Sequence, residues 1–190
     1  LDLFLASAPW QGSPHVLLQN DGSGTMSATE LLVGKHWDEN IWASEFVDLD
    51  GDGFLDLIIG GANYNDDSKV LWGSSKGSYG GEAWALELGA NESYDFDAED
   101  IDGDGDRDLL VTLADLQTSQ SHLRLFINQG KRRFTEETAE RFDVAGHDQS
   151  WLDFSFLQDI DDDGDLDILA DEWGRLLSWL NEDGIFVKQP

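Results

Sequence analysis

One nine-residue pattern occurs three times in the sequence, and this repetition limits what the chain can fold into. The copies read DLDGDGFLD (48–56), DIDGDGDRD (100–108) and DIDDDGDLD (159–167). Each copy has Asp at positions 1, 3, 5 and 9 and Gly at position 6, and a short apolar run follows each one. Carboxylates held this close repel one another, so a folded chain needs a positive charge among them. The spacing therefore predicts a cation site in each loop.

The ligand chemistry of these loops favours Ca²⁺. This ion takes about 6–8 oxygen ligands, whereas Mg²⁺ prefers a tighter octahedron and Zn²⁺ prefers His or Cys, which the loops lack. We expect side-chain ligands from positions 1, 3, 5 and 9 and a backbone carbonyl from position 7. The predicted metal ligands of about three Ca²⁺ sites are Asp48, Asp50, Asp52, Phe54 and Asp56; Asp100, Asp102, Asp104, Asp106 and Asp108; and Asp159, Asp161, Asp163, Asp165 and Asp167.

Two other readings of the loops are weaker. An EF-hand shares the first six positions but needs a bidentate Glu at position 12, where this chain has Ile59, Val111 and Ala170. A solvated acidic run is the ordinary fate of clustered Asp residues. Random acidity would not repeat the same positions three times, each before an apolar strand.

The loops belong to a longer repeat. Aromatic runs with partial alternation precede them, and strand–turn–strand patterns follow at 16–26, 70–79, 125–134 and 178–186. The first residues, LDLFLA, resemble LDILA at 166–170, so we expect Asp2 to end a fourth loop whose front half is missing. Each unit is then strand, acidic loop, strand and hairpin.

About four short strands per unit, repeated along a chain, are typical of a β-propeller. The sequence thus predicts an all-β fold, a β-propeller of about four calcium-loop blade repeats in a single domain over 1–190. The approximate repeats are 1–40, 41–92, 93–148 and 149–190. A β-sandwich with accidental repeats is the alternative. The stretch 136–142 is the one short helical candidate.

Composition excludes several classes of partner. The 190 residues include 40 acidic and 11 basic side chains, a formal net charge of -29. Nucleic acid needs a basic face, so we expect none as a partner. We also expect no transmembrane segment, because no apolar run is long enough. The chain has no Cys and hence no disulfide framework. The one basic cluster, 131–133, is expected to be a solvated turn or a docking point for an acidic neighbour.

Few residues outside the loops form patterns typical of catalytic or ligand-binding sites. The four His are scattered, and G-x-S-x-G at 73–77 falls in a hairpin turn rather than a nucleophile elbow. We therefore expect no enzyme. Trp10 and Trp37 lie in polar stretches and are candidate ligand contacts. Other Trp residues are expected to pack, Trp42 and Trp151 in the core and Trp72 and Trp179 between blades.

The stretch FVDLDGDGFLDLIIG (46–60) resembles the FG-GAP/VCBS repeat, the calcium-loop blade unit of integrin α-subunit propellers. The resemblance implies a propeller of about seven blades and an extracellular or cell-surface module that mediates adhesion. With fewer units, this chain is either a fragment of such a propeller or a small closed ring. The implied ligand is a protein or a glycan. The alternatives are a lectin, or a polysaccharide lyase or hydrolase or its accessory domain.

Overall fold

The structure is a computed structural model that describes residues 2–5, 15–30, 40–62, 68–79, 83–89, 91–143, 147–148 and 151–190. Within these ranges the chain forms strands β1 to β16 and one short helix, α1 (Thr138–Arg141). The prediction of an all-β chain is confirmed, and α1 lies inside the predicted helical stretch 136–142. No helix in these ranges is long and apolar enough to cross a membrane.

The strands form four antiparallel sheets, and neighbouring strands in a sheet follow one another in the chain, with one exception in the third sheet. The first sheet contains β1 (Leu3–Leu5), β2 (Val16–Asn20) and β3 (Met26–Glu30). The second contains β4 (Asn40–Val47), β5 (Asp56–Ala62), β6 (Lys69–Leu71) and β7 (Ala83–Ala85). The third contains β8 (Glu92–Asp97), β9 (Leu109–Asp115), β10 (Gln120–Asn128) and β11 (Phe134–Glu136), and β12 (His147–Asp148) pairs with β10. The fourth contains β13 (Ser155–Gln158), β14 (Asp167–Glu172), β15 (Arg175–Glu182) and β16 (Ile185–Lys188).

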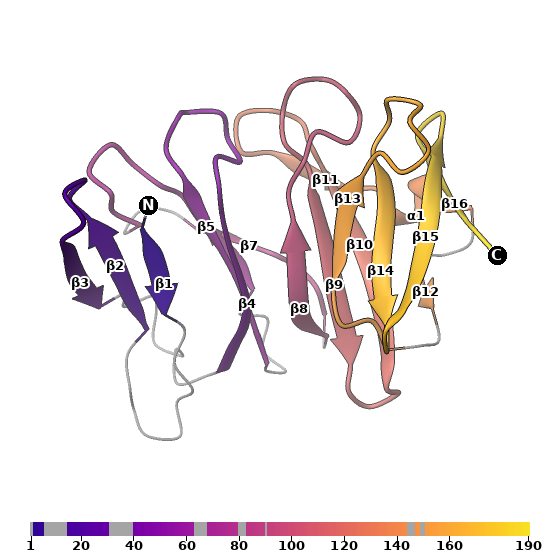
Figure 1. Ribbon diagram of the computed structural model, residues 1–190, viewed down its shortest axis with the longest axis horizontal. Helices are drawn as coiled ribbons and strands as arrows, with labels where there is room; N and C mark the ends of the chain where they lie inside the picture. Colours follow the sequence, from indigo (N-terminus) through magenta and orange to yellow (C-terminus); the bar gives the residue numbers. More distant parts are fainter. Residues whose placement is uncertain are drawn as a thin grey trace.

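The four sheets stand side by side in chain order, with the first and fourth at opposite ends of the row (Figure 1). Strand β8 contacts β4 and β5 on one side and β13 on the other. Neighbouring sheets approach closely at Gly60, where an added Cβ would collide with Ser93 and the Phe96 ring. The row is therefore a stack of packed sheets.

The core lies between the sheets because alternate residues of each strand face opposite neighbours. In β9, Leu109, Val111 and Leu113 pack toward the second sheet, and Leu110 packs toward the fourth. Trp72 lies in the cluster between the second and third sheets, and Trp179 in the one between the third and fourth. The prediction that these two Trp residues pack between repeats is confirmed.

Two predicted details are wrong. The strand after the turn in 70–79 is β7, which begins at Ala83, beyond that stretch. Trp42 is 44% exposed and so is not a core residue. A register shift between Ile41 and Ala43 makes Trp42 the extra residue of a β-bulge, and bulges commonly redirect a side chain.

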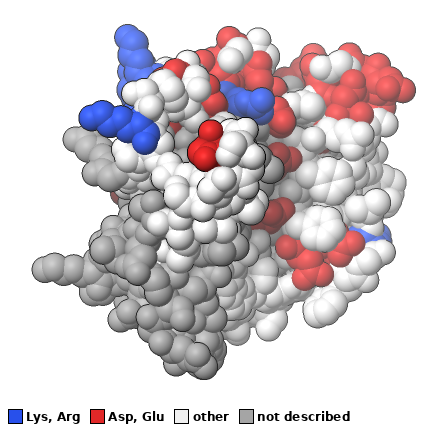
Figure 2. Space-filling model, turned by 60° about the vertical axis from the view of Figure 1, so that its left-hand side comes forward, with Lys and Arg blue, Asp and Glu red and all other residues white. Residues whose placement is uncertain are grey.

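Each acidic loop joins the first two strands of a four-stranded or larger sheet. The loops follow β4, β8 and β13, and all three lie along the same edge of the row, at the top of Figure 1. In Figure 2, which is turned about the vertical axis, acidic side chains gather mainly toward the same upper edge. The repeat thus places three similar acidic loops along one edge of the molecule.

Candidate metal centres

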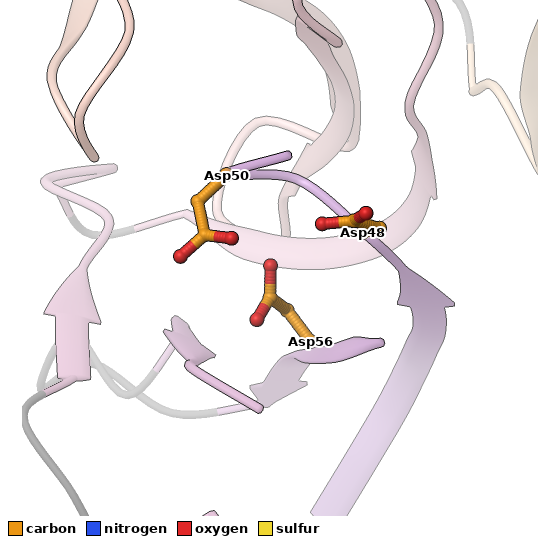
Figure 3. Close-up of side chains that lie close together, drawn as sticks. All are labelled: Asp48, Asp50 and Asp56. Carbon is orange, nitrogen blue, oxygen red and sulfur yellow. The ribbon is translucent and has the colours of Figure 1, made fainter. Parts of the chain in front are cut away.

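Each acidic loop brings three carboxylates together. Within a group, one oxygen from each of three Asp residues lies within 4.8 Å of the others. Figure 3 shows the first group with its carboxylates turned toward one another. The groups contain positions 1, 3 and 9 of each loop: Asp48, Asp50 and Asp56; Asp100, Asp102 and Asp108; Asp159, Asp161 and Asp167.

The aspartate at position 9, which we call the closing aspartate, joins its loop to the following hairpin. Asp108 accepts hydrogen bonds from the backbone N–H groups of Ile101 and Asn128, both at 2.8 Å. Asp56 and Asp167 are buried and bonded in the same way. Two fixed oxygens orient the carboxylate, so the loop keeps its position relative to the sheet.

The aspartate at position 1 shapes the loop itself. Asp100 accepts from the N–H groups of Gly103 and Gly105, and Asp48 accepts from Gly53 at 2.9 Å. Gly53 has φ +89°, a conformation that residues with a Cβ rarely adopt. This is the physical reason for Gly at position 6 of the pattern.

An orphaned oxygen tests whether a cation fits. Oδ1 of Asp48 is buried and has no hydrogen-bond partner among the described residues. A buried carboxylate oxygen without a partner is costly unless a cation or water meets it. With an all-oxygen donor set from three carboxylates, the loop residues fit a hard divalent cation such as Ca²⁺.

The residues at positions 5 and 7 are not part of the three carboxylate groups. Asp52, Asp104 and Asp163 belong to none of the three groups. Each instead accepts a hydrogen bond at 2.9 Å from the backbone N–H of the residue at position 7. Ligation by these aspartates, and by the carbonyls of Phe54, Asp106 and Asp165, stays a prediction.

Two hairpin asparagines contact all three acidic loops. The amide nitrogen of Asn128 donates to the carbonyls of Leu49 and Arg107, so one side chain joins two loops. Asn181 donates to Leu166 in the fourth sheet. Our reading of the sequence missed this role, although the Asn that opens each N-x-G or N-x-x-G turn was a visible signal.

The N-terminal segment carries the closing position of a fourth unit. Asp2 accepts a hydrogen bond from the backbone N–H of Asn20 at 2.9 Å. The closing aspartates make the same contact with the first residue of their hairpin turns, Gly73, Asn128 and Asn181. The match between Asp2 and these positions therefore holds in the structure.

The electrostatics of the carboxylate groups favour a bound cation. Burial raises the pKa of Asp56 and of Asp108 to about 6, although the backbone N–H groups that each accepts act against this. Nearby Asp residues raise the two pKa values further. A divalent cation among these carboxylates would stabilise their ionised forms.

Three aromatic rings form a second feature, away from the acidic loops. Trp42 and Tyr94 meet edge to face at 4.7 Å, and Tyr94 and Trp151 meet in the same way at 5.0 Å. Tyr94, like Trp42, is the extra residue of a β-bulge. The rings come from three successive repeats, and we call them the aromatic row. The candidate ligand residues Trp10 and Trp37 lie outside the described residues.

The remaining motif is accounted for by local structure. In the stretch 73–77, the N–H of Gly77 donates to the carbonyl of Ser74 at 2.8 Å, which closes a turn between β6 and β7. The match to G-x-S-x-G is thus part of a turn, as predicted.

Comparison with known families agrees with the repeat. The model of a family described as FG-GAP-like repeat matches residues 1–59, 48–111 and 100–170. Each match ends beyond the closing aspartate of one unit. A search of curated proteins found no significant match to the chain.

Proposed function

The chain belongs to the FG-GAP-like repeat family, and on this premise we propose that it is a calcium-stabilised, non-enzymatic binding module of an extracellular or cell-surface protein. The observation that carries the proposal is the recurrence of three carboxylate groups at equivalent places in three sheets. Calcium at each site would neutralise carboxylates that otherwise repel. Because the ion binds the folded loop, its binding free energy adds to the stability of the fold.

Thermal unfolding tests the metal assignment. The protein is stripped with EDTA and then titrated with CaCl₂, with MgCl₂ as the control. We expect a large rise in melting temperature that depends on Ca²⁺, because Mg²⁺ prefers a tighter octahedral site. If neither ion changes the melting temperature, the loops are not metal sites.

We also propose that the four sheets are successive blades of a propeller with further blades. Support comes from the face of the fourth sheet that points away from the third. Leu176 on this face is 62% exposed, and Leu169, Leu180 and Val187 are only partly covered. A sheet with apolar residues on both faces is suited to lie between two neighbours.

The aromatic row is the candidate ligand surface. Partly exposed rings offer apolar contact to a protein or stack on a sugar, and aromatic residues often dominate binding energy. Either a protein adhesion partner or a glycan would suit it, and the second case would make the module a lectin. Trp10 and Trp37 remain additional candidates for this contact.

Binding arrays separate these ligand classes. The calcium-loaded protein is applied to a glycan array and to an array of surface and matrix proteins. Trp42→Ala should weaken any binding found, whereas Trp173→Ala, at a 77% exposed residue in the β14–β15 turn, should not. Equal binding by both variants would exclude the aromatic row as the contact.

The enzymatic alternatives have a direct assay. A lyase or hydrolase would release new reducing ends or lower the viscosity of an acidic polysaccharide. We expect no turnover, because the acidic chain would repel such a polymer unless calcium bridged the two. Turnover that survives purification would overturn the non-enzymatic assignment.

A further inference from the structure

An arginine from one repeat reaches the acidic loop of the repeat before it. Nε of Arg132, in the β10–β11 turn, donates to Oδ2 of Asp50 at 2.5 Å. Its Nη2 lies 3.7 Å from Asp52. Asp50 belongs to the first carboxylate group, and its side chain is only 5% exposed. A fixed positive charge therefore already stands beside the proposed cation position.

The backbone and a Trp ring hold this arginine in place. Lys131 and Arg132 both adopt left-handed conformations, with φ +58° and +60°. The Arg132 guanidinium lies 4.7 Å from the centre of the Trp72 ring, within the range of a cation–π contact. The turn and the Trp72 ring thus hold the guanidinium beside Asp50. Moving the side chain away would lose these contacts.

The three loops differ in this respect. In the second, Nη2 of Arg141 lies 3.6 Å from Asp102, a longer contact than that of Arg132. In the third, Asp161 meets no Lys or Arg of the described chain within 4.0 Å. Both oxygens of Asp50 are engaged, since Oδ1 accepts from the N–H of Asp52 at 3.1 Å. The carboxylate at position 3 is therefore held most closely by protein groups in loop 48–56 and least closely in loop 159–167.

We propose that Arg132 is an internal counterion that competes with the divalent cation at loop 48–56. A cation that binds there must displace the guanidinium from Asp50 or bind beside its positive charge, and either event lowers affinity. The loops then fill in a fixed order as calcium rises, 159–167 first, 100–108 second and 48–56 last. This inference rests on the proposed calcium function.

Isothermal titration of the EDTA-stripped full chain with CaCl₂ tests the proposal. Arg132→Gly removes the guanidinium and suits the left-handed backbone. Lys131→Gly is the matched control, because it removes one positive charge from the neighbouring residue at nearly the same φ. We expect Arg132→Gly to tighten the weakest binding step about tenfold, the scale of one nearby charge at partly screened distance. Lys131→Gly should change that step by less than about threefold.

A second variant assigns the step to its loop. Asp48→Asn should remove the weakest step and leave the tighter ones. The inference is overturned if Asp48→Asn removes a tighter step, or if Arg132→Gly leaves the weakest step unchanged or weakens it. No calcium binding at any step would instead overturn the proposed function itself, so the two failures are distinguishable.

Discussion

Two aspartates of the same acidic loop, at positions 9 and 3, are held differently by the rest of the protein. At position 9, Asp108 is buried and accepts hydrogen bonds from two backbone N–H groups, that of Ile101 in the loop and that of Asn128 in the following hairpin. At position 3, Asp102 is exposed and accepts from Asp104 within the loop at 3.3 Å. The closing carboxylate joins strands together, whereas the Asp102 carboxylate remains near solvent. Asp50, at the same position of the first loop, is instead covered and bonded to Arg132.

This difference separates what the fold needs from what a cation would need. The closing aspartates make these contacts with the protein's own backbone, so we expect them to stabilise the protein in EDTA as well as in calcium. At position 3, Asp102 has only a long contact with Arg141 at 3.6 Å, so we expect it to add little to stability until a cation binds, whereas Asp50 is already paired with Arg132. The same residue type is therefore expected to contribute far more to stability in EDTA at Asp108 than at Asp102, six residues away.

Loss of a closing carboxylate is the strongest test of this comparison. Asp108→Ala should lower the free energy of unfolding by about 3 kcal/mol or more, because two buried N–H groups lose their acceptor. We expect this loss in EDTA as well as in calcium, measured by urea unfolding. Asp104→Ala, from the same loop but outside the carboxylate group, is the control in EDTA. Full metal-free stability in Asp108→Ala would mean that the closing aspartate acts only through the cation.

The hairpin side of the same contact should give the next largest effect. Asn128→Ala removes donors to the carbonyls of Leu49 and Arg107, and we expect a loss of about 2 kcal/mol in EDTA. Asn181→Ala removes one such donor, to Leu166 at 3.2 Å, and should cost about half as much. Equal losses from the two variants would show that the link between two loops adds nothing.

Much of this architecture could be predicted from the sequence because local patterns dictate it. The Asp and Gly positions of 100–108 specify the loop, and the apolar runs after each loop specify buried strands. The equivalence of Asp2 with the closing aspartates could be predicted from the repeat alone. Each of these features depends on residues that lie close together in the chain.

Features that depend on distant segments could not be predicted in this way. The exposure of Trp42 follows from a β-bulge, and no local pattern marks where β4 and β5 shift register. The contact between Arg132 and Asp50 joins residues 82 positions apart. The sequence showed the basic cluster 131–133 but did not show which acidic group it would meet.

Removal of a position-3 carboxylate should show the opposite pattern from Asp108→Ala. In EDTA, Asp102→Ala should change the free energy of unfolding by less than about 0.5 kcal/mol, because its contact with Arg141 is long and partly solvated. In calcium, the same variant should lose the stabilisation that one site supplies. Melting curves with and without calcium measure both effects. A large loss in EDTA would contradict the distinction between the aspartates at positions 3 and 9.

The comparison extends to the carboxylates of β4 and β8. Asp97 accepts from the N–H of Leu157 at 2.6 Å, and Asp95 from that of Ser155 at 3.1 Å, so both join the third sheet to the fourth. Glu45 in β4 has a buried Oε2 without a hydrogen-bond partner in the described chain. Burial, and then Asp97, Asp95 and Glu99, raise the pKa of Glu45 to about 8.

A raised pKa means that the fold prefers the neutral acid. The contribution of Glu45 to stability is therefore full below its unfolded pKa, near 4.5, and falls as the pH rises from there to about 8. Glu45→Gln keeps the neutral shape at every pH and should stabilise the protein by about 1 kcal/mol at pH 8.5 but not at pH 5. Urea midpoints in EDTA at the two pH values measure this, with Glu87→Gln at an exposed site as the control. The same change at both pH values would mean that the Glu45 carboxyl does not titrate in this window, and that its orphaned oxygen is tolerated for another reason.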